Sequence, residues 1–205
     1  MIVKVCGNAK NISEVALLKP DLMGFIFYDK SPRHACGVNP DEIISLASDI
    51  KRVGVFVNAS EEYILSTCQR YGLHAVQLHG SESPDFCLRL KDRGFGVYKA
   101  IGILDKEDME AVKRYDGSAD MIVLDTKTER HGGSGVKFDW SLLDQYPLKI
   151  PYLLSGGISH EDADFLSASI YPWMAGVDIN SRFEVSPGFK DISLLTSFIN
   201  KIRTR

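Results

Sequence analysis

Eight short apolar runs, several of them rich in β-branched residues, recur along the chain, and the segments between them have apolar residues at helical spacing. This alternation between a strand-like and a helix-like period is typical of βα units that build a parallel sheet. The runs predict strands over residues 2–5, 22–27, 53–57, 75–78, 97–101, 121–124, 152–154 and 176–179.

Eight βα units can close into a (β/α)8 barrel (TIM barrel), and 205 residues lie near the lower end of the size range of such barrels. The main alternative is an open, doubly wound sheet. Nucleotide-binding sheets of that kind usually carry a GxGxxG or GxxxxGK[ST] motif after the first strand, and this chain has neither there. We therefore expect an α/β protein with a single (β/α)8-barrel domain over residues 1–205.

Several helix boundaries are marked in the sequence. Asn39 and Ser83 each place a capping side chain in front of a proline, which suits the first helical turn. Asn11 followed by Glu14 resembles a capping box. A last helix is expected where one apolar stripe comprises Ile192, Leu195, Phe198, Ile199 and Ile202.

The composition favours a small-molecule partner. The chain has 24 Lys and Arg against 27 Asp and Glu, and no run of like charges that would bind nucleic acid or a membrane surface. We find no signal peptide and no apolar stretch long enough to span a bilayer, so we expect a cytoplasmic protein. No CxxC pair or cluster of Cys and His occurs, so we expect no metal site and no disulfide framework among Cys6, Cys36, Cys68 and Cys87.

Polar and glycine residues follow most of the predicted strands. In a barrel, function collects on the loops after the strands, so these residues are expected at one rim. They are Cys6 and Gly7, the Ser31-Pro32-Arg33 turn, His79 and Gly80, Asp125, the Ser155-Gly156-Gly157 turn, and Asp178 with Asn180 and Ser181.

Gly156 and Gly157 lie between the seventh predicted strand and Ser159, which could cap a helix. Together with Asn180 and Ser181 after the eighth strand, they match the phosphate site that such barrels often form from loops seven and eight, where exposed backbone amides bind the anion. The alternative is a Gly-Gly turn that serves backbone geometry alone.

Cys6 is a candidate proton-transfer group because it ends the first strand. Lys4 lies two residues earlier on the same face, where an ammonium would favour the thiolate over the resting thiol. The alternative is a buried cysteine that packs as a small apolar side chain, which is the commoner fate of free cysteine.

Asp125 ends the sixth predicted strand and faces the same rim, with a helix cap or a loop salt bridge as the alternative interpretation. The glycine-rich loop over residues 126–137 is either a mobile cover or only a flexible connection. Arg33 has the forked donor geometry that suits a carboxylate or phosphate, although most arginines are solvated at the surface. His79 is either a proton carrier or a hydrogen-bonded structural imidazole.

The chain closely resembles the phosphoribosylanthranilate isomerase family over nearly its whole length. The resemblance rests on motifs that occur together and in order: KVCG at 4–7, GFIF at 24–27, SPR at 31–33, VGVFVN at 53–58, VQLHG at 76–80, LD at 124–125, GGSG at 132–135, FDW at 138–140, SGGI at 155–158, GVD at 176–178 and PGFKD at 187–191.

The resemblance implies an Amadori rearrangement of N-(5-phosphoribosyl)anthranilate without a cofactor, in tryptophan biosynthesis, by a monomer or a homodimer. It makes Asp125 the acid and Cys6 the base, and each such role typically contributes about 10²–10⁴-fold in rate. It places Arg33 on the anthranilate carboxylate. The other expected substrate contacts are Lys4, His79 and Asp178, and the expected phosphate contacts are Gly133, Gly156, Gly157, Asn180 and Ser181.

Two positions depart from the family pattern. Asn8 and Ala9 follow Gly7 where the family commonly has an apolar residue and Thr, which concerns contacts of the first loop. Arg182 replaces a glycine that the family often has in the last phosphate loop, which removes backbone freedom but adds a cation that could favour phosphate.

Other functions fit the barrel less well. A phosphosugar epimerase would be expected to use paired carboxylates and often a metal, and the synthase acting on the next intermediate would use a lysine acid. A barrel that only binds phosphate, or a thiol redox sensor, would have no need of a Cys and Asp pair on one rim.

Overall fold

Eight parallel strands close into a barrel in chain order in the computed structural model, which describes residues 1–127 and 137–204. The last strand pairs with the first, with Lys4 opposite Asp178. The predicted α/β (β/α)8 barrel is confirmed. Its strands are β1 (Ile2–Val5), β2 (Leu22–Ile26), β3 (Lys51–Phe56), β4 (Ala75–Leu78), β5 (Gly96–Ile103), β6 (Met121–Thr126), β7 (Tyr152–Leu154) and β8 (Met174–Ile179).

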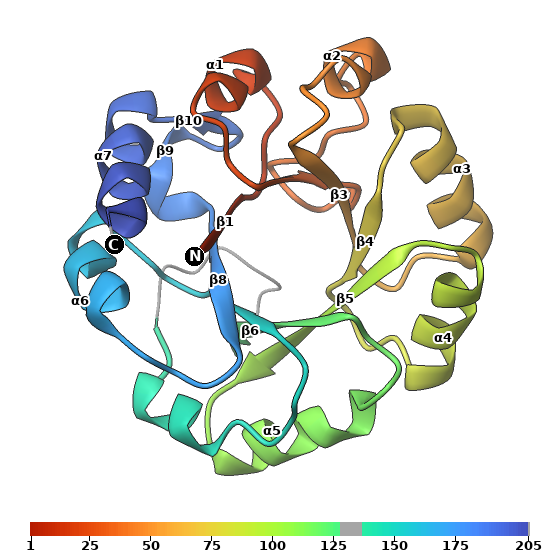
Figure 1. Ribbon diagram of the computed structural model, residues 1–205. Helices are drawn as coiled ribbons and strands as arrows, with labels where there is room; N and C mark the ends of the chain where they lie inside the picture. The colour runs from red at the N-terminus through yellow and green to blue at the C-terminus, as the bar shows by residue number, and fades with distance from the viewer. Residues whose placement is uncertain (128–136, 205) are drawn as a thin grey trace.

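Helices surround the barrel as an outer ring (Figure 1). They are α1 (Ile12–Leu17), α2 (Pro40–Ile44), α3 (Glu61–Tyr71), α4 (Pro84–Asp92), α5 (Lys106–Ala111), α6 (Ala163–Ala168) and α7 (Ile192–Arg203). Shorter 3₁₀ segments occupy Val112–Tyr115, Trp140–Gln145, His160–Asp162 and Ser181–Phe183. The described part of the connection from β6 to β7 therefore forms a 3₁₀ segment where the repeating pattern implied an α-helix.

Two of the three expected caps are confirmed. The side chain of Asn39 accepts a hydrogen bond from the N–H of Asp41, and Ser83 accepts one from the N–H of Phe86. The capping box at Asn11 does not form: its side chain contacts the carboxylate of Glu14 but caps no N–H of the first turn, and it binds the backbone N–H and C=O of Lys190. This long-range contact ties α1 to the loop before α7.

Strand boundaries differ from the sequence prediction most clearly at β5 and β6. These strands pair from Tyr98 with Met121 to Ile103 with Thr126, so the ladder continues past the apolar run that marked each strand. Asp125 consequently lies within β6, paired with Gly102 of β5. An apolar run marks only the apolar part of a strand, and in β6 the run stops at Asp125 although the ladder continues.

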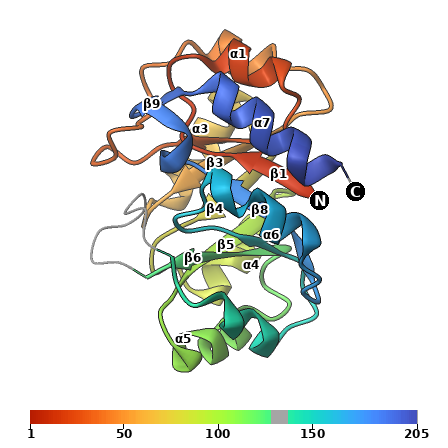
Figure 2. The ribbon, with the colours of Figure 1, turned by 90° about the vertical axis from the view of Figure 1, so that its left-hand side faces the viewer.

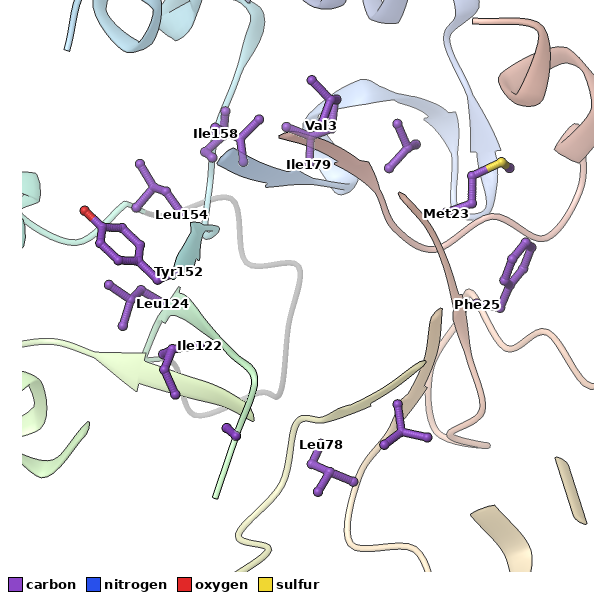
Figure 3. Close-up of a cluster of buried hydrophobic side chains, with 14 of the residues drawn as sticks. Val3, Met23, Phe25, Leu78, Ile122, Leu124, Tyr152, Leu154, Ile158 and Ile179 are labelled. Carbon is purple, nitrogen blue, oxygen red and sulfur yellow. The ribbon is translucent and has the colours of Figure 1, made fainter. Parts of the chain in front are cut away.

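The core has two layers because side chains alternate across each strand. One layer fills the barrel and includes Leu22, Val53, Ala75, Tyr98, Ala100, Met121, Val123 and Leu153. The other lies between barrel and helices, and Figure 3 shows part of it, with Val3, Met23, Phe25, Leu78, Ile122, Leu124, Tyr152, Leu154, Ile158 and Ile179 labelled.

The two ends of the barrel differ. Both termini lie close together at the end where the strands begin, and the loops after the strands extend from the opposite end (Figure 2). A short antiparallel hairpin, which the apolar pattern did not predict, follows β8 and consists of β9 (Glu184–Ser186) and β10 (Phe189–Lys190). Within the described ranges, no helix is long and apolar enough to cross a bilayer.

Candidate active site

A pocket opens at the carboxyl ends of the strands, and side chains from most of the strands line it. Three lining positions continue the alternation of the barrel interior: Asp125 follows Met121 and Val123, and Gln77 and His79 follow Ala75. The same face that packs the barrel below therefore presents polar groups at its mouth. The lining residues are Cys6, Ile26, Tyr28, Ser31, Val55, Val57, Gln77, His79, Asp125, Ser155, Gly156, Gly157, Ile158, Asp178, Asn180, Ser181 and Arg182.

Cys6 lies just past β1 and is 5% exposed. Its N–H donates to the carbonyl of Ile179, which continues the pairing of β1 with β8. The neighbouring strand leaves room for the thiol because it has Gly24 there: a Cβ on this residue would lie 2.8 Å from Sγ of Cys6. The side chain of Asn8 binds the carbonyls of Val5 and Gly24, so this departure from the family pattern braces the strand ends beside Cys6.

Burial raises the pKa of the Cys6 thiol. As expected, the ammonium of Lys4 lowers this pKa. Asp178 raises the pKa and Lys190 lowers it, both by smaller amounts. The effect of burial outweighs the lowering by the two lysines. Cys6 is therefore a thiol at neutral pH, and Lys4 alone does not ionise it.

Lys4 and Asp178 form a buried ion pair below Cys6. Nζ of Lys4 donates to Oδ2 of Asp178 over 2.7 Å, and both side chains are almost fully excluded from solvent. Burial alone would lower the pKa of Lys4, but the charges of Asp178 and Cys6 raise it, so Lys4 stays a cation. Oδ1 of Asp178 is buried with no hydrogen-bond partner among the described residues, and Asp178 lines the pocket. This oxygen is an acceptor available to a ligand.

Asp125 lies opposite His79 across the pocket mouth. Nε2 of His79 is 3.1 Å from Oδ2 of Asp125, and Nδ1 of His79 is 3.0 Å from the side-chain amide of Gln77. Oδ1 of Asp125 accepts from the N–H of Thr126. Both Asp125 and His79 are mostly buried yet reach the pocket, so a ligand there meets a carboxyl group held by a ring nitrogen.

Gly156 and Gly157 line the pocket next to Asp125, and both have positive φ angles. A Cβ on Gly156 would lie 2.6 Å from the backbone nitrogen of Thr126 and 2.9 Å from Oδ1 of Asp125. The backbone of this turn therefore approaches Asp125 more closely than any side chain allows. Asn180, Ser181 and Arg182 line the same pocket.

Arg33 is not among the described residues that line the pocket; its guanidinium binds Glu184 instead. Nε of Arg33 lies 3.0 and 2.9 Å from the two carboxylate oxygens, and Nη2 lies 2.7 Å from Oε2. The same carboxylate accepts from Nζ of Lys190, which also donates to Oδ1 of Asn180 over 2.8 Å. Glu184 thus joins the β2 loop to the β8 loop.

The structure brings most of the predicted site residues together. Cys6, His79, Asp125, Gly156, Gly157, Asp178, Asn180 and Ser181 line one pocket, and Lys4 lies beneath it. Gly133 and most of the 126–137 loop lie outside the described residues.

Sequence reasoning missed three polar residues of this region. Gln77 could have been found, because strand alternation places it on the same face as His79. Lys190 lies within the PGFKD motif but no role was assigned to it, and Glu184 gave no signal, because both belong to the unpredicted hairpin and contribute through a buried ion pair. Across the described ranges, no group of three or more His, Cys, Asp or Glu side chains could hold a metal ion.

Comparison with known proteins agrees with this geometry. The family model for N-(5'phosphoribosyl)anthranilate (PRA) isomerase matches residues 3–201. The N-(5'-phosphoribosyl)anthranilate isomerase of Parabacteroides distasonis is 45% identical over 206 residues, which cover 98% of this chain and 93% of that protein.

Two crystal structures are similar over the full length of both chains. The phosphoribosyl anthranilate isomerase of Thermotoga maritima has a TM-score of 0.87 at 35% identity. A phosphoribosyl anthranilate isomerase in complex with reduced 1-(o-carboxyphenylamino)-1-deoxyribulose 5-phosphate has a TM-score of 0.83 at 32% identity. The chain therefore belongs to the N-(5'-phosphoribosyl)anthranilate isomerase family.

Proposed function

We propose that this chain converts N-(5-phosphoribosyl)anthranilate into 1-(2-carboxyphenylamino)-1-deoxyribulose 5-phosphate, an intramolecular redox step of tryptophan biosynthesis. One observation carries the proposal: Cys6 and Asp125, the two groups that the reaction needs, line a single pocket together with the Gly156-Gly157 turn. Family membership supports it. Each step transfers a proton while bonds rearrange within the substrate, and no external oxidant or reductant takes part, so the protein's own acid and base suffice for it.

Asp125 begins the reaction as the acid. In its protonated form it gives a proton to the ribose ring oxygen, the bond from this oxygen to C1 breaks, and the anthranilate nitrogen lone pair forms an iminium with C1. His79, 3.1 Å from the carboxyl group, holds Asp125 toward the pocket.

Cys6 completes the reaction as the base. Its thiolate removes the proton from C2, and the electrons of that bond form the enolamine, which becomes the ketone when C1 gains a proton and the C2 hydroxyl loses one. Because burial raises the pKa of Cys6, only a small fraction of free enzyme carries the thiolate at neutral pH. We therefore expect the rate to rise with pH above neutrality.

Binding is assigned to groups around this pair. The amides of Gly156 and Gly157, with Asn180 and Ser181, hold the phosphate, and Gly133 contributes from the loop after β6. Oδ1 of Asp178, which has no hydrogen-bond partner within residues 1–127 and 137–204, accepts a hydrogen bond from a substrate hydroxyl, and Lys4 supports Asp178 from below.

Arg33 binds the anthranilate carboxylate with the edge of its guanidinium that Glu184 does not use. Glu184 takes up Nε and Nη2, which leaves Nη1 for the substrate. Glu184 thereby fixes the orientation in which Arg33 meets the carboxylate.

We expect residues 1–205 to act as one barrel domain in the cytoplasm, without a metal or cofactor, as a monomer or a homodimer. Light scattering on the purified protein distinguishes the two assemblies.

The test follows the loss of fluorescence of the anthranilate substrate with wild type, Cys6→Ser and Asp125→Asn. Each substitution should lower kcat by at least about 10²-fold. Cys87→Ser is the matched control, because Cys87 is a buried thiol on α4 outside the pocket. Full activity of Cys6→Ser or Asp125→Asn would remove the role assigned to that residue, and an inactive wild type would contradict the proposed reaction.

A further inference from the structure

Lys99 carries a buried ammonium on the outer face of the barrel. It lies on β5, and the ion pair that it forms with Glu82 is 2% and 3% exposed at the two side chains. Burial lowers the pKa of Lys99, and Glu82 opposes this change. An ion pair with so little solvent stabilises a protein no better than apolar residues of the same size, so stability alone does not explain why charges are present here.

The ammonium of Lys99 binds backbone carbonyls at the end of β4. Nζ donates to the carbonyl of Leu78 over 2.9 Å and to the carbonyl of Gly80 over 2.7 Å, and it also reaches Oε2 of Glu82 at 3.0 Å. Leu78 and Gly80 are the two neighbours of His79. A single cation therefore holds the backbone on both sides of this histidine.

The carboxylate of Glu82 fixes the same turn through its N–H groups. Its oxygens accept from the N–H of Gly80 at 2.9 and 3.2 Å and from the N–H of Asn58 at 2.8 Å. Asn58 has a φ of +51°, and its side chain accepts from the N–H of Ser81. Glu82 thus joins the loop after β3 to the loop after β4.

We propose that Glu82 and Lys99 are a positioning pair for the isomerase reaction, which sets the turn around His79 so that Nε2 meets the carboxyl group of Asp125. The inference rests on the proposed function. Neither side chain lines the pocket among the described residues, so both act through His79. Charged groups are required because three backbone N–H and C=O groups of this turn need ionic partners that an apolar pair cannot supply.

The test compares Glu82→Met, Lys99→Met, the double variant and Glu82→Gln. A buried charge without its partner destabilises each single Met variant, and the double variant should lose less thermal stability than the two single variants together, although the backbone groups of the turn stay unpaired. We expect kcat of the double variant to stay about tenfold to a hundredfold below wild type, because the turn is no longer fixed. KM should change by less than about threefold, because the phosphate loops after β7 and β8 are untouched.

Tyr115→Phe is the matched control. Its hydroxyl donates to the backbone carbonyl of Glu82, and its ring lies under the ammonium of Lys99 at 5.6 Å. Phe keeps the aromatic ring next to Lys99 and removes only the hydrogen bond to the backbone carbonyl of Glu82. The hydrogen bonds that Glu82 and Lys99 make to the turn around His79 remain. Its kcat should equal that of wild type.

A second measurement does not depend on turnover. The chain has five histidines, so the ring resonance of His79 can be assigned by its loss in His79→Gln. Glu82→Gln should shift this resonance, and Tyr115→Phe should not. A kcat that recovers together with stability in the double variant, or an unmoved His79 resonance in Glu82→Gln, would overturn the positioning role. An inactive wild type with the expected shift would instead contradict only the proposed reaction.

Discussion

Lys4 and Asp178 occupy paired positions of the first and last strands, and Nζ of Lys4 donates to Oδ2 of Asp178 over 2.7 Å. The pair cancels much of the positive field that Lys4 would exert on Cys6. With this field reduced, burial keeps the pKa of Cys6 above its ordinary value, so Cys6 is a thiol at neutral pH.

Asp178→Asn should increase the thiolate fraction of Cys6. The substitution removes a negative charge that raises the Cys6 pKa and leaves the Lys4 cation in place, so the pKa falls and the thiolate forms at lower pH. Lys4→Met should have the opposite effect. The measurement is ultraviolet thiolate absorbance against pH, with Cys6→Ser subtracted. Equal titration curves for both variants would show that this pair does not control the thiol.

Arg182→Gly should weaken phosphate binding. Arg182 lines the pocket with Ser181 and Gly157, and an exposed ionic contact is worth about 0.2–1 kcal/mol. KM should rise about two- to fivefold with kcat unchanged, and inorganic phosphate should inhibit less strongly. Arg93→Gln removes an equal charge from the turn after α4 and should leave KM unchanged. If Arg182→Gly has the same KM as wild type, the other loop residues bind the phosphate without Arg182.

Glu184→Gln should reduce stability and flatten its dependence on acidic pH. Burial alone would raise the pKa of Glu184, but Arg33 and Lys190 outweigh it and hold the pKa below its ordinary value of 4.5. A carboxyl group with a lowered pKa stabilises the fold above its unfolded pKa, and this contribution is lost as the pH falls through the folded pKa.

Breaking this buried pair should cost about 3–5 kcal/mol at neutral pH. Urea unfolding from neutral pH down to about pH 3 measures both effects. Asp164→Asn is the control, because its pair with Lys201 leaves Asp164 80% exposed. If Glu184→Gln loses stability on acidification as steeply as wild type, other carboxylates cause the pH dependence.

Gly156→Ala should lower both stability and kcat. The φ of Gly156 is +84°, and the added Cβ would lie 2.9 Å from Oδ1 of Asp125. We expect a loss of about 1–3 kcal/mol from backbone strain and a fall in kcat of about tenfold or more, because Asp125 must shift. Gly94→Ala is a matched control: its φ is +88°, but no atom lies within 4 Å of the added Cβ. If Gly156→Ala and Gly94→Ala have the same kcat, the close approach of the Gly156 backbone to Asp125 does not affect the reaction.

The sequence predicted the barrel well because the strands are short apolar runs buried on both faces, and most of the predicted rim residues follow directly from where these runs stop. Asp125 was placed correctly, although it lies inside β6 and not after it. The partner of Arg33 could not be predicted, because Glu184 lies 151 residues away in a short hairpin without the long apolar run that marks the barrel strands. The same holds for Asn11. Its sequence neighbours suggested a helix cap, but its side chain binds the backbone of Lys190, 179 residues away.

Closure of the barrel between β1 and β8 also has a consequence for synthesis of the protein. Asp125 belongs to the sixth strand and Cys6 follows the first, but Lys4 finds its counter-ion only 174 residues later. Until β8 has left the ribosome, the nascent barrel has two unpaired strand edges and an uncompensated cation facing its interior. Completion of the last strand therefore seals the sheet and neutralises the site in the same event, so a chain that stops short of β8 should be prone to aggregate.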